Sequence, residues 1–185
     1  MPHHPATHTI EIADLTRELP LFEVAPGTRI AVLNVLGDTE LVEAAARALA
    51  TRLAPVDYAV LITAEAKSIP LIHALSVATG KPYVVLRKTW KPYMGDALSA
   101  ETRSITTGDS QTLYLDEKDR ALVADARVAL IDDVISSGST LQAMRAIVDR
   151  AGATVATEAA ILTEGERENW RDVIALGHLP VFTDG

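Results

Sequence analysis

The stretch from Arg127 to Arg145, which reads RVALIDDVISSGSTLQAMR, constrains the fold of this chain more than any other. It begins as an apolar strand, ends that strand in two adjacent carboxylates, Asp132 and Asp133, and passes through small hydroxyl residues into a helix with an apolar stripe. In open α/β sheets ligands bind at the carboxyl ends of strands, and a helix N-terminus favours an anion. The order predicts a sugar-phosphate site, with acids for sugar hydroxyls and a loop for phosphate.

A structural capping turn is the competing interpretation. A strand-to-helix turn favours Ser, Thr or Asp as the N-cap and tolerates glycine in the bend. Two neighbouring acids, followed by a loop with four hydroxyl residues in the five positions 136–140, exceed what a cap needs. A P-loop is not indicated, because no lysine follows Gly138, and no G-x-G-x-x-G motif occurs.

Length and composition favour one α/β domain spanning residues 1–185, because single domains typically run to about 100–200 residues. The hydrophobic content of 48% is ample for a core on both faces of a sheet. A net charge of −8 argues against a broad nucleic-acid surface, so a cationic group in a pocket would be a local exception. The absence of cysteine excludes disulfides and thiolate catalysis.

The N-terminal residues 1–9 are expected to be disordered. They hold His3, His4 and His8, which could bind a metal opportunistically, but a loose chain end is the favoured reading. No basic segment precedes an apolar core here, and no run of about 18 apolar residues occurs anywhere. The default expectation is a soluble cytoplasmic protein that does not contact a membrane.

Strands and helices are expected to alternate along most of the chain, which favours a mostly parallel sheet with helical crossovers. Residues 10–24 form a mixed segment, and a charged loop at 164–168 is expected to be solvated, with His178 in a turn. The expected strands are 29–36, 58–63, 83–86, 127–133, 155–162, and short pieces at 173–176 and 179–182; the expected helices are 38–53, 69–79 and 139–151.

Residues 87–110 break this alternation with a polar segment of no sustained period. Irregular segments of more than about 12–15 residues in a compact domain are usually functional or disordered. Residues 111–115 can return as a strand, so 87–115 is predicted to be a long flexible flap. The cations at its base, Arg87, Lys88 and Lys91, fit a ligand site and a solvated turn equally well.

Three segments resemble the type I phosphoribosyltransferases, most closely the adenine phosphoribosyltransferases. VALIDDVISSGSTL resembles their phosphoribosyl diphosphate signature, YAVLIT followed by AEAKS their pyrophosphate loop, and VVLRK the strand that leads into their mobile flap. Order and spacing agree from about Leu19 to Thr163. The resemblance implies a mostly parallel twisted sheet flanked by helices, a small N-terminal hood, a flap and a homodimer.

The resemblance also implies roles. Asp132 and Asp133 would hold the ribose hydroxyls, which requires the strand to be unwinding there because successive residues point to opposite faces. Lys67 and Arg87 would act with these acids in catalysis, and Mg²⁺ would arrive with the diphosphate, without direct protein ligands. The 5′-phosphate loop would comprise Val134, Ile135, Ser136, Ser137, Gly138, Ser139 and Thr140, and the diphosphate contacts Glu65, Ala66, Lys67, Ser68, Arg87, Lys88 and Lys91.

The acceptor is less well defined. The flap Glu of the adenine enzymes has no match at residues 104–108, although Asp109 or Glu101 could substitute, and Arg29 matches their base-side arginine only approximately. Adenine is the first expectation and xanthine, guanine or hypoxanthine the alternatives; a non-catalytic regulatory relative that binds phosphoribosyl diphosphate is another. Residues that could pack on the base or equally fill the core are Leu21, Phe22, Val134 and Ile135.

Overall fold

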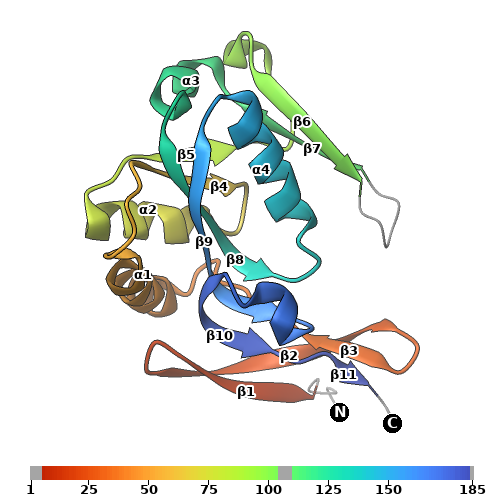
Figure 1. Cartoon of the computed structure of the whole chain (residues 1–185). Helices are drawn as coiled ribbons and strands as arrows, with labels where there is room; N and C mark the ends of the chain where they lie inside the picture. Colours follow the sequence, from red (N-terminus) through yellow and green to blue (C-terminus); the bar gives the residue numbers. More distant parts are fainter. Residues whose placement is uncertain (1–5, 104–109, 184–185) are drawn as a thin grey trace.

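A twisted parallel sheet forms the centre of the molecule (Figure 1). The computed structural model describes residues 6–103 and 110–183. The strand order is β10-β9-β8-β4-β5, and every neighbouring pair runs parallel. The strands are β4 Val60–Ala64, β5 Tyr83–Leu86, β8 Arg127–Ile135, β9 Thr154–Glu164 and β10 Ile174–Leu179. The predicted α/β class with a mostly parallel sheet is confirmed.

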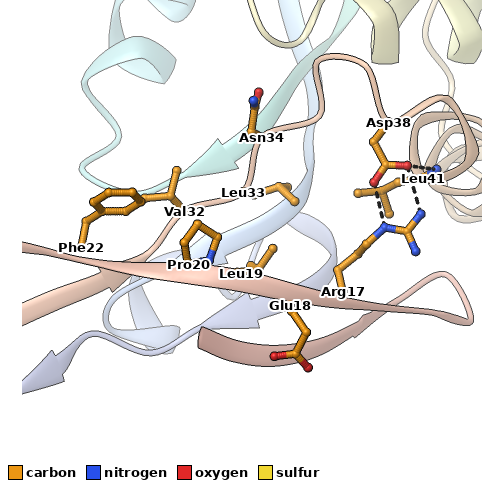
Figure 2. Close-up of a pocket in the computed structure, with 10 residues that line it drawn as sticks. All are labelled: Arg17, Glu18, Leu19, Pro20, Phe22, Val32, Leu33, Asn34, Asp38 and Leu41. Atoms are coloured by element: carbon orange, nitrogen blue, oxygen red, sulfur yellow. Dashed lines mark hydrogen bonds and ion pairs between the residues drawn. The ribbon is translucent and has the colours of Figure 1, made fainter. Parts of the chain in front are cut away.

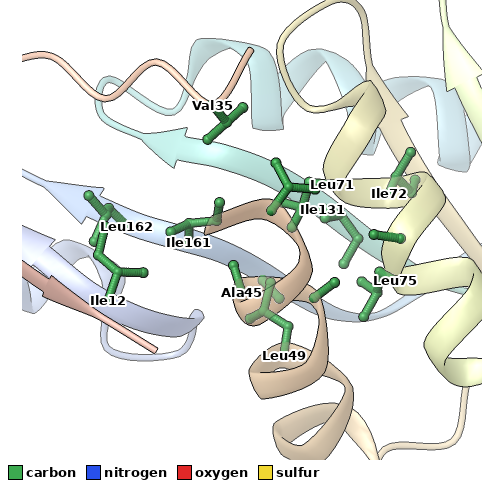
Figure 3. Close-up of a cluster of buried hydrophobic side chains, with 14 of the residues drawn as sticks. Ile12, Val35, Ala45, Leu49, Leu71, Ile72, Leu75, Ile131, Ile161 and Leu162 are labelled. Carbon is green, nitrogen blue, oxygen red and sulfur yellow. The ribbon is translucent and has the colours of Figure 1, made fainter. Parts of the chain in front are cut away.

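Helices cover both faces of this sheet, as its alternating apolar side chains require. On one face α1 (Thr39–Leu53) and α2 (Ile69–Thr79) pack against Leu61, Ile131 and Ile161, and Figure 3 shows part of this core. On the other face α4 (Ser139–Arg150) packs against the residues between them, such as Ile62 and Leu130, together with the short α3 (Glu117–Val123). Each such buried side chain contributes roughly 1.5–3 kcal/mol of transfer free energy.

The helix boundaries follow the capping residues that the sequence shows. Asp38 precedes α1 and its carboxyl group accepts a hydrogen bond from the backbone N–H of Leu41 at 3.1 Å. Gly80 ends α2 with φ at +67°, and its N–H donates to the carbonyl of Ser76. Both predicted helices are confirmed.

The N-terminal residues form a second, antiparallel sheet, which we call the hood. Its order is β1-β2-β3-β11, with β1 at Thr7–Ile12, β2 at Leu15–Ala25, β3 at Thr28–Ala31 and β11 at Phe182–Thr183. Two predictions were wrong here. Residues 7–9 belong to a strand rather than to a disordered end, and residues 10–24 form most of a hairpin rather than a mixed segment.

The predicted strand at 29–36 also needs correction. It ends at Ala31 and pairs antiparallel with β2 and β11, so it belongs to the hood and not to the parallel sheet. The sequence does carry a signal for a strand in β1, where Ile10 and Ile12 alternate with exposed polar residues. The hairpin turn, Ala13 and Asp14, has positive φ at both positions but lacks the glycine that usually marks such turns.

The flap is largely a β-hairpin. Strands β6 (Leu98–Arg103) and β7 (Ser110–Leu115) pair antiparallel after the one-turn helix η1 (Pro92–Met94). Ala100, Leu113 and Leu115 are buried in the same core as α4. The returning strand at 111–115 is confirmed, whereas the prediction of irregular structure was wrong for 98–103. The expectations for residues 104–109, including Asp109, lie outside the described residues.

The C-terminal strands extend further than predicted. Strand β9 runs to Glu164, which therefore is not part of a solvated loop, and the helix η2 (Arg167–Trp170) follows. His178 lies inside β10 rather than in a turn, with its Nδ1 2.9 Å from the hydroxyl of Thr163. None of the helices within 6–103 and 110–183 has the length and apolar content needed to cross a bilayer.

Candidate active site

Two neighbouring acids on β8 converge on one serine of the adjacent loop. Ser68 Oγ lies 2.8 Å from Asp132 Oδ1 and 3.0 Å from Asp133 Oδ1. The backbone N–H of Asp133 donates to Ser68 Oγ and to Asp132 Oδ1. Because a serine hydroxyl has a single proton to donate, it satisfies one carboxylate at a time. The pair is therefore held close together with fewer donors than two full charges require.

The protonation of Asp132 reflects this crowding. Burial, reinforced by the neighbouring charge of Asp133, raises the pKa of Asp132 to about 7. Asp133 is itself buried, and its Oδ2 has no hydrogen-bond partner among the described residues; Lys67 Nζ lies 3.8 Å away. An acceptor oxygen of this kind is suited to hydroxyl donors from a ligand.

The strand does not unwind at the acids, contrary to the expectation. The ladder between β8 and β9 continues through Asp132, opposite Ala160, to Ile135, opposite Thr163. Ile135 is buried in the core under α4, so it cannot pack on a base. Val134, on the opposite face, lines a cavity beside Asp133.

The loop after β8 bends at Gly138, which has φ at +75° and precedes the first turn of α4. A Cβ atom on Gly138 would lie 2.8 Å from the ring of Trp170, so glycine is required for two separate reasons. The hydroxyl oxygens of Ser137 and Ser139 lie 3.1 Å apart. This is the predicted turn of hydroxyl residues at a helix N-terminus, a geometry that favours anions.

A polar cavity of about 120 Å³ opens beside the acids. We call it the polar cavity; its lining residues are Ala64, Glu65, Ala66, Lys67, Ser68, Lys88, Asp132, Asp133 and Thr140. It thus brings together most of the residues that the resemblance assigned to diphosphate and ribose. The peptide bond between Glu65 and Ala66 is cis.

Arg87 and Lys91 occupy different positions from Lys88. Arg87 Nε pairs with Glu65 Oε2 at 2.6 Å, while the backbone N–H of Lys88 donates to Glu65 Oε1. Arg87 therefore holds the loop that contains Glu65 in place. It is not among the described residues that line the polar cavity. Lys91 is exposed before η1, likewise outside that lining.

A second cavity, of about 190 Å³, adjoins the first. We call it the apolar cavity after one part of its lining, formed by Ile30, Ala31, Val32, Leu33 and Val134; the rest of the lining is polar and consists of Lys67, Asp133, Ser136 and Glu164. Lys67 and Asp133 line both cavities. Glu164 was missed by the sequence reasoning, and burial raises the pKa of its carboxyl group.

The hood carries a third cavity of about 400 Å³, shown in Figure 2. Phe22 lies at one end near Val32, and at the other end Arg17 binds Asp38 through two hydrogen bonds, of 2.7 and 3.0 Å. Arg17 also binds Glu40 at 2.9 Å, so it ties the hood to the start of α1.

The other residues expected near the base are not among the described residues that line the polar or the apolar cavity. Phe22 lines the hood cavity, Leu21 pairs with Ala31 in the hood sheet, and Glu101 is exposed on β6. Arg29 lies on β3, outside the described residues that line the polar or the apolar cavity.

The donor set suits a magnesium ion that arrives with a substrate. Among the described residues no three His, Asp, Glu or Cys side chains gather as a metal site. Two carboxylates beside a polar cavity fit Mg²⁺, which keeps waters and substrate phosphates as ligands and uses one or two carboxylates. The orphaned Oδ2 of Asp133 is compatible with a ligand's hydroxyl or a metal-bound water.

Comparison with known proteins gives consistent matches. Residues 37–175 match the family model of the phosphoribosyl transferase domain. A xanthine phosphoribosyltransferase of Chloroflexus aurantiacus is 33% identical over 161 residues, which is 83% of this chain and 75% of the relative. A hypoxanthine/guanine phosphoribosyltransferase of Methanococcus vannielii is 34% identical over 109 residues, 59% of this chain and only 55% of the relative.

Solved structures with a similar fold include two adenine phosphoribosyltransferases. That of Thermoanaerobacter pseudethanolicus has a TM-score of 0.71 at 22% identity, covering 86% of this chain and 95% of its own. That of Saccharomyces cerevisiae has a TM-score of 0.64 at 17% identity, covering 93% and 92%. The chain belongs to the phosphoribosyltransferase family, whose members are glycosyltransferases, and its fold is that of the type I members.

Proposed function

We propose that this protein is a purine phosphoribosyltransferase, which transfers ribose 5-phosphate from phosphoribosyl diphosphate to a purine base and releases diphosphate. The observation that carries the proposal is the pair of adjoining cavities that share Lys67 and Asp133. A cavity lined mostly by polar groups, beside one that has an apolar wall as well as polar groups, fits a charged donor and a flat base that packs on that wall. The shared residues lie where the two substrates would meet.

In this proposal each part of the site binds one part of the donor. Asp132 and Asp133, whose carboxyl groups both meet Ser68 at the polar cavity although β8 continues past them, accept hydrogen bonds from the ribose hydroxyls. The loop 136–140 binds the 5′-phosphate. Lys67 and Lys88, with the backbone of Ala66, face the diphosphate. Arg87 acts as a positioning residue that holds Glu65 and thereby the loop before Ser68.

The reaction forms a bond from a base nitrogen to the anomeric carbon and breaks that carbon's bond to the diphosphate oxygen. Positive charge develops on the ribose and negative charge on the leaving diphosphate, and the N–H proton of the base is released to water. The carboxylates lie beside the former charge, and the ammonium groups of Lys67 and Lys88 beside the latter. Bound Mg²⁺ would supply further positive charge next to the diphosphate.

For the acceptor we propose a 6-oxopurine ahead of adenine. The relatives with at least 30% identity are named for xanthine and for hypoxanthine and guanine. The adenine enzymes are similar at 22% and 17% identity, where likeness concerns the fold. Adenine, the first expectation from the sequence, stays a prediction to be tested in the same assay.

The test is diphosphate release. The protein is incubated with Mg²⁺ and phosphoribosyl diphosphate, and xanthine, guanine, hypoxanthine, adenine and a pyrimidine are offered one at a time. We expect release with at least one 6-oxopurine and none with the pyrimidine. Saturable binding of phosphoribosyl diphosphate without release for any base would instead support the non-catalytic, regulatory alternative.

We also propose that residues 1–185 act as one domain, that the protein is a cytoplasmic homodimer, and that residues 87–115 close over the bound substrates. Closure would limit hydrolysis of the short-lived ribosyl cation. Light scattering after size exclusion measures the oligomeric state. A monomeric mass across the working concentration range would contradict the dimer.

A further inference from the structure

Glu164 lies at the far end of the apolar cavity from the reacting groups. Along the ladder between β8 and β9, Asp132 pairs with Ala160 and Val134 with Leu162, which sets Asp133 level with Ile161. Glu164 follows three residues later, or about 10 Å further along the strand at about 3.3 Å per residue. Both Asp133 and Glu164 nevertheless line the same cavity.

The position of Glu164 is fixed while its carboxyl group is left without a partner. Trp170 Nε1 donates a 2.8 Å hydrogen bond to the carbonyl oxygen of Glu164, and β9 pairs on both sides up to this point. In the part of the chain that the structure describes, no hydrogen bond or ion pair reaches the carboxyl group. A partly buried acceptor on the wall of a cavity is a group that a ligand donor would stabilise.

A bound base would present one particular edge to Glu164. The base nitrogen that attacks the anomeric carbon belongs to the five-membered ring and must lie near Asp133 and Lys67, where the donor sugar is proposed to bind. The six-membered ring then extends along the cavity walled by Val32 and Val134, away from the sugar. Its outer edge, with ring positions 1 and 2, points towards Glu164.

Building on the proposed function, we propose that Glu164 is the specificity-determining residue for the acceptor and that it selects guanine over xanthine. Guanine carries two adjacent donors on the outer edge, the N1–H and the 2-amino group, which match the two oxygens of a carboxylate. Hypoxanthine offers only the N1–H. Xanthine places a carbonyl oxygen at position 2, whose lone pairs would face the carboxylate.

The raised pKa of Glu164 agrees with this assignment. Burial disfavours the carboxylate in the absence of ligand. The two N–H donors of guanine would compensate for the hydration that the buried carboxylate has lost. The carbonyl group of xanthine would instead add to the free-energy cost of burying that carboxylate. The preference for guanine is therefore a consequence of where the acid is buried.

The experiment compares Glu164→Gln and Glu164→Ala with the wild type and with Glu166→Gln, a control on an exposed acid two residues away. The readouts are kcat/KM for guanine and for xanthine, the KM for phosphoribosyl diphosphate, and calorimetric binding of guanosine and xanthosine 5′-monophosphates. In both Glu164 variants we expect the guanine-to-xanthine ratio to fall roughly 10- to 100-fold, the loss typical of a hydrogen bond to a charged group. The KM for phosphoribosyl diphosphate and the control should not change.

Two outcomes would overturn the inference. One is a wild type that uses xanthine as well as guanine or better. The other is that, in both Glu164 variants, kcat/KM falls by the same factor for guanine and xanthine, and the binding affinity falls by the same factor for the two nucleotides. Failure of the proposed function looks different, because diphosphate release would then be missing for every base. Nucleotide binding would still report on Glu164 in that case: guanosine 5′-monophosphate must lose affinity in the variants more than xanthosine 5′-monophosphate does.

Discussion

The polar and apolar cavities share two residues but are built in different ways. The polar cavity takes its walls from the carboxyl ends of β4 and β8, from residues that follow β4 and β5, and from the first turn of α4. The apolar cavity takes one wall from the hood, at residues 30–33, and its far end from Glu164 on β9. In the proposed function the donor therefore binds at the parallel sheet, while the acceptor also contacts the hood. Changes in the two cavities should have separable effects.

The largest effect is expected at Asp133. Asp133→Asn removes the buried charge next to the developing positive charge while conserving side-chain size, so diphosphate release should fall roughly 100- to 1,000-fold with every base. Steady-state kinetics measure the loss, and circular dichroism checks that the fold is intact. Normal turnover in a folded variant would show that the acids do not act on the sugar. Asp57→Asn, on an exposed acid before β4, serves as control.

A smaller loss is expected at Lys67, which borders both cavities. Lys67→Ala should lower kcat roughly 10- to 100-fold, because it removes one of two ammonium groups facing the leaving diphosphate. Lys118→Ala, on an exposed lysine of α3, is the matched control. If both variants turned over at the wild-type rate, Lys67 would be no more than a surface charge paired with Asp133.

The raised pKa of Asp132 should make the free energy of unfolding depend on pH. Its folded-state pKa of about 7 lies above the unfolded value of about 3.9, so between about pH 4 and 7 the folded state retains a proton that the unfolded state has released. The free energy of unfolding from this group therefore falls as the pH rises through that window. Asp132→Asn should remove this fall, so the stability of the ligand-free variant relative to the wild type should be greater at pH 8 than at pH 4.5.

Urea titrations at pH 4.5 and pH 8 measure this difference, with Asp172→Asn, a fully exposed acid, as control. Parallel pH profiles for the wild type and Asp132→Asn would mean that Asp132 ionises normally in the folded protein.

The smallest effect is expected at the attachment of the hood. Arg17→Gln loses the contacts to Asp38 and Glu40 that tie β2 to α1. Because the apolar cavity has a wall in the hood and the described lining of the polar cavity does not include the hood, the KM for the base should rise a few-fold while the KM for phosphoribosyl diphosphate stays unchanged. Arg47→Gln, on the exposed face of α1, is the control. An equal change in both constants would contradict the separation of the two cavities.

The polar cavity could be predicted from the sequence because its parts are local. A strand, two acids and a hydroxyl-rich turn occupy consecutive positions, and the pyrophosphate-like loop follows its strand directly. Two details required coordinates: Ile135 faces the core because the strand continues past the acids, and Arg87 reaches Glu65 instead of the cavity. Neither follows from spacing alone.

The apolar cavity was harder to predict from the sequence, because it depends on pairing between segments that are far apart in the chain. The hood joins residues near both ends of the described chain, and its first turn lacks the usual glycine. Glu164 stands in the run EGERE, which has the composition of a solvated loop. Only the structure shows that Glu164 ends β9 and lines the apolar cavity.

Trp170 lies where its intrinsic fluorescence would respond to ligand binding. Its ring lies over Gly138 in the phosphate loop, and its indole N–H holds the carbonyl of Glu164 at the other cavity. The chain has only two tryptophans, and the other, Trp90, is 45% exposed at the base of the flap. In a Trp90→Phe background, the remaining tryptophan fluorescence would come from a residue that contacts both Gly138, in the loop proposed to bind the donor, and Glu164, proposed to bind the acceptor. Occupancy of both cavities could then be followed in real time without a label.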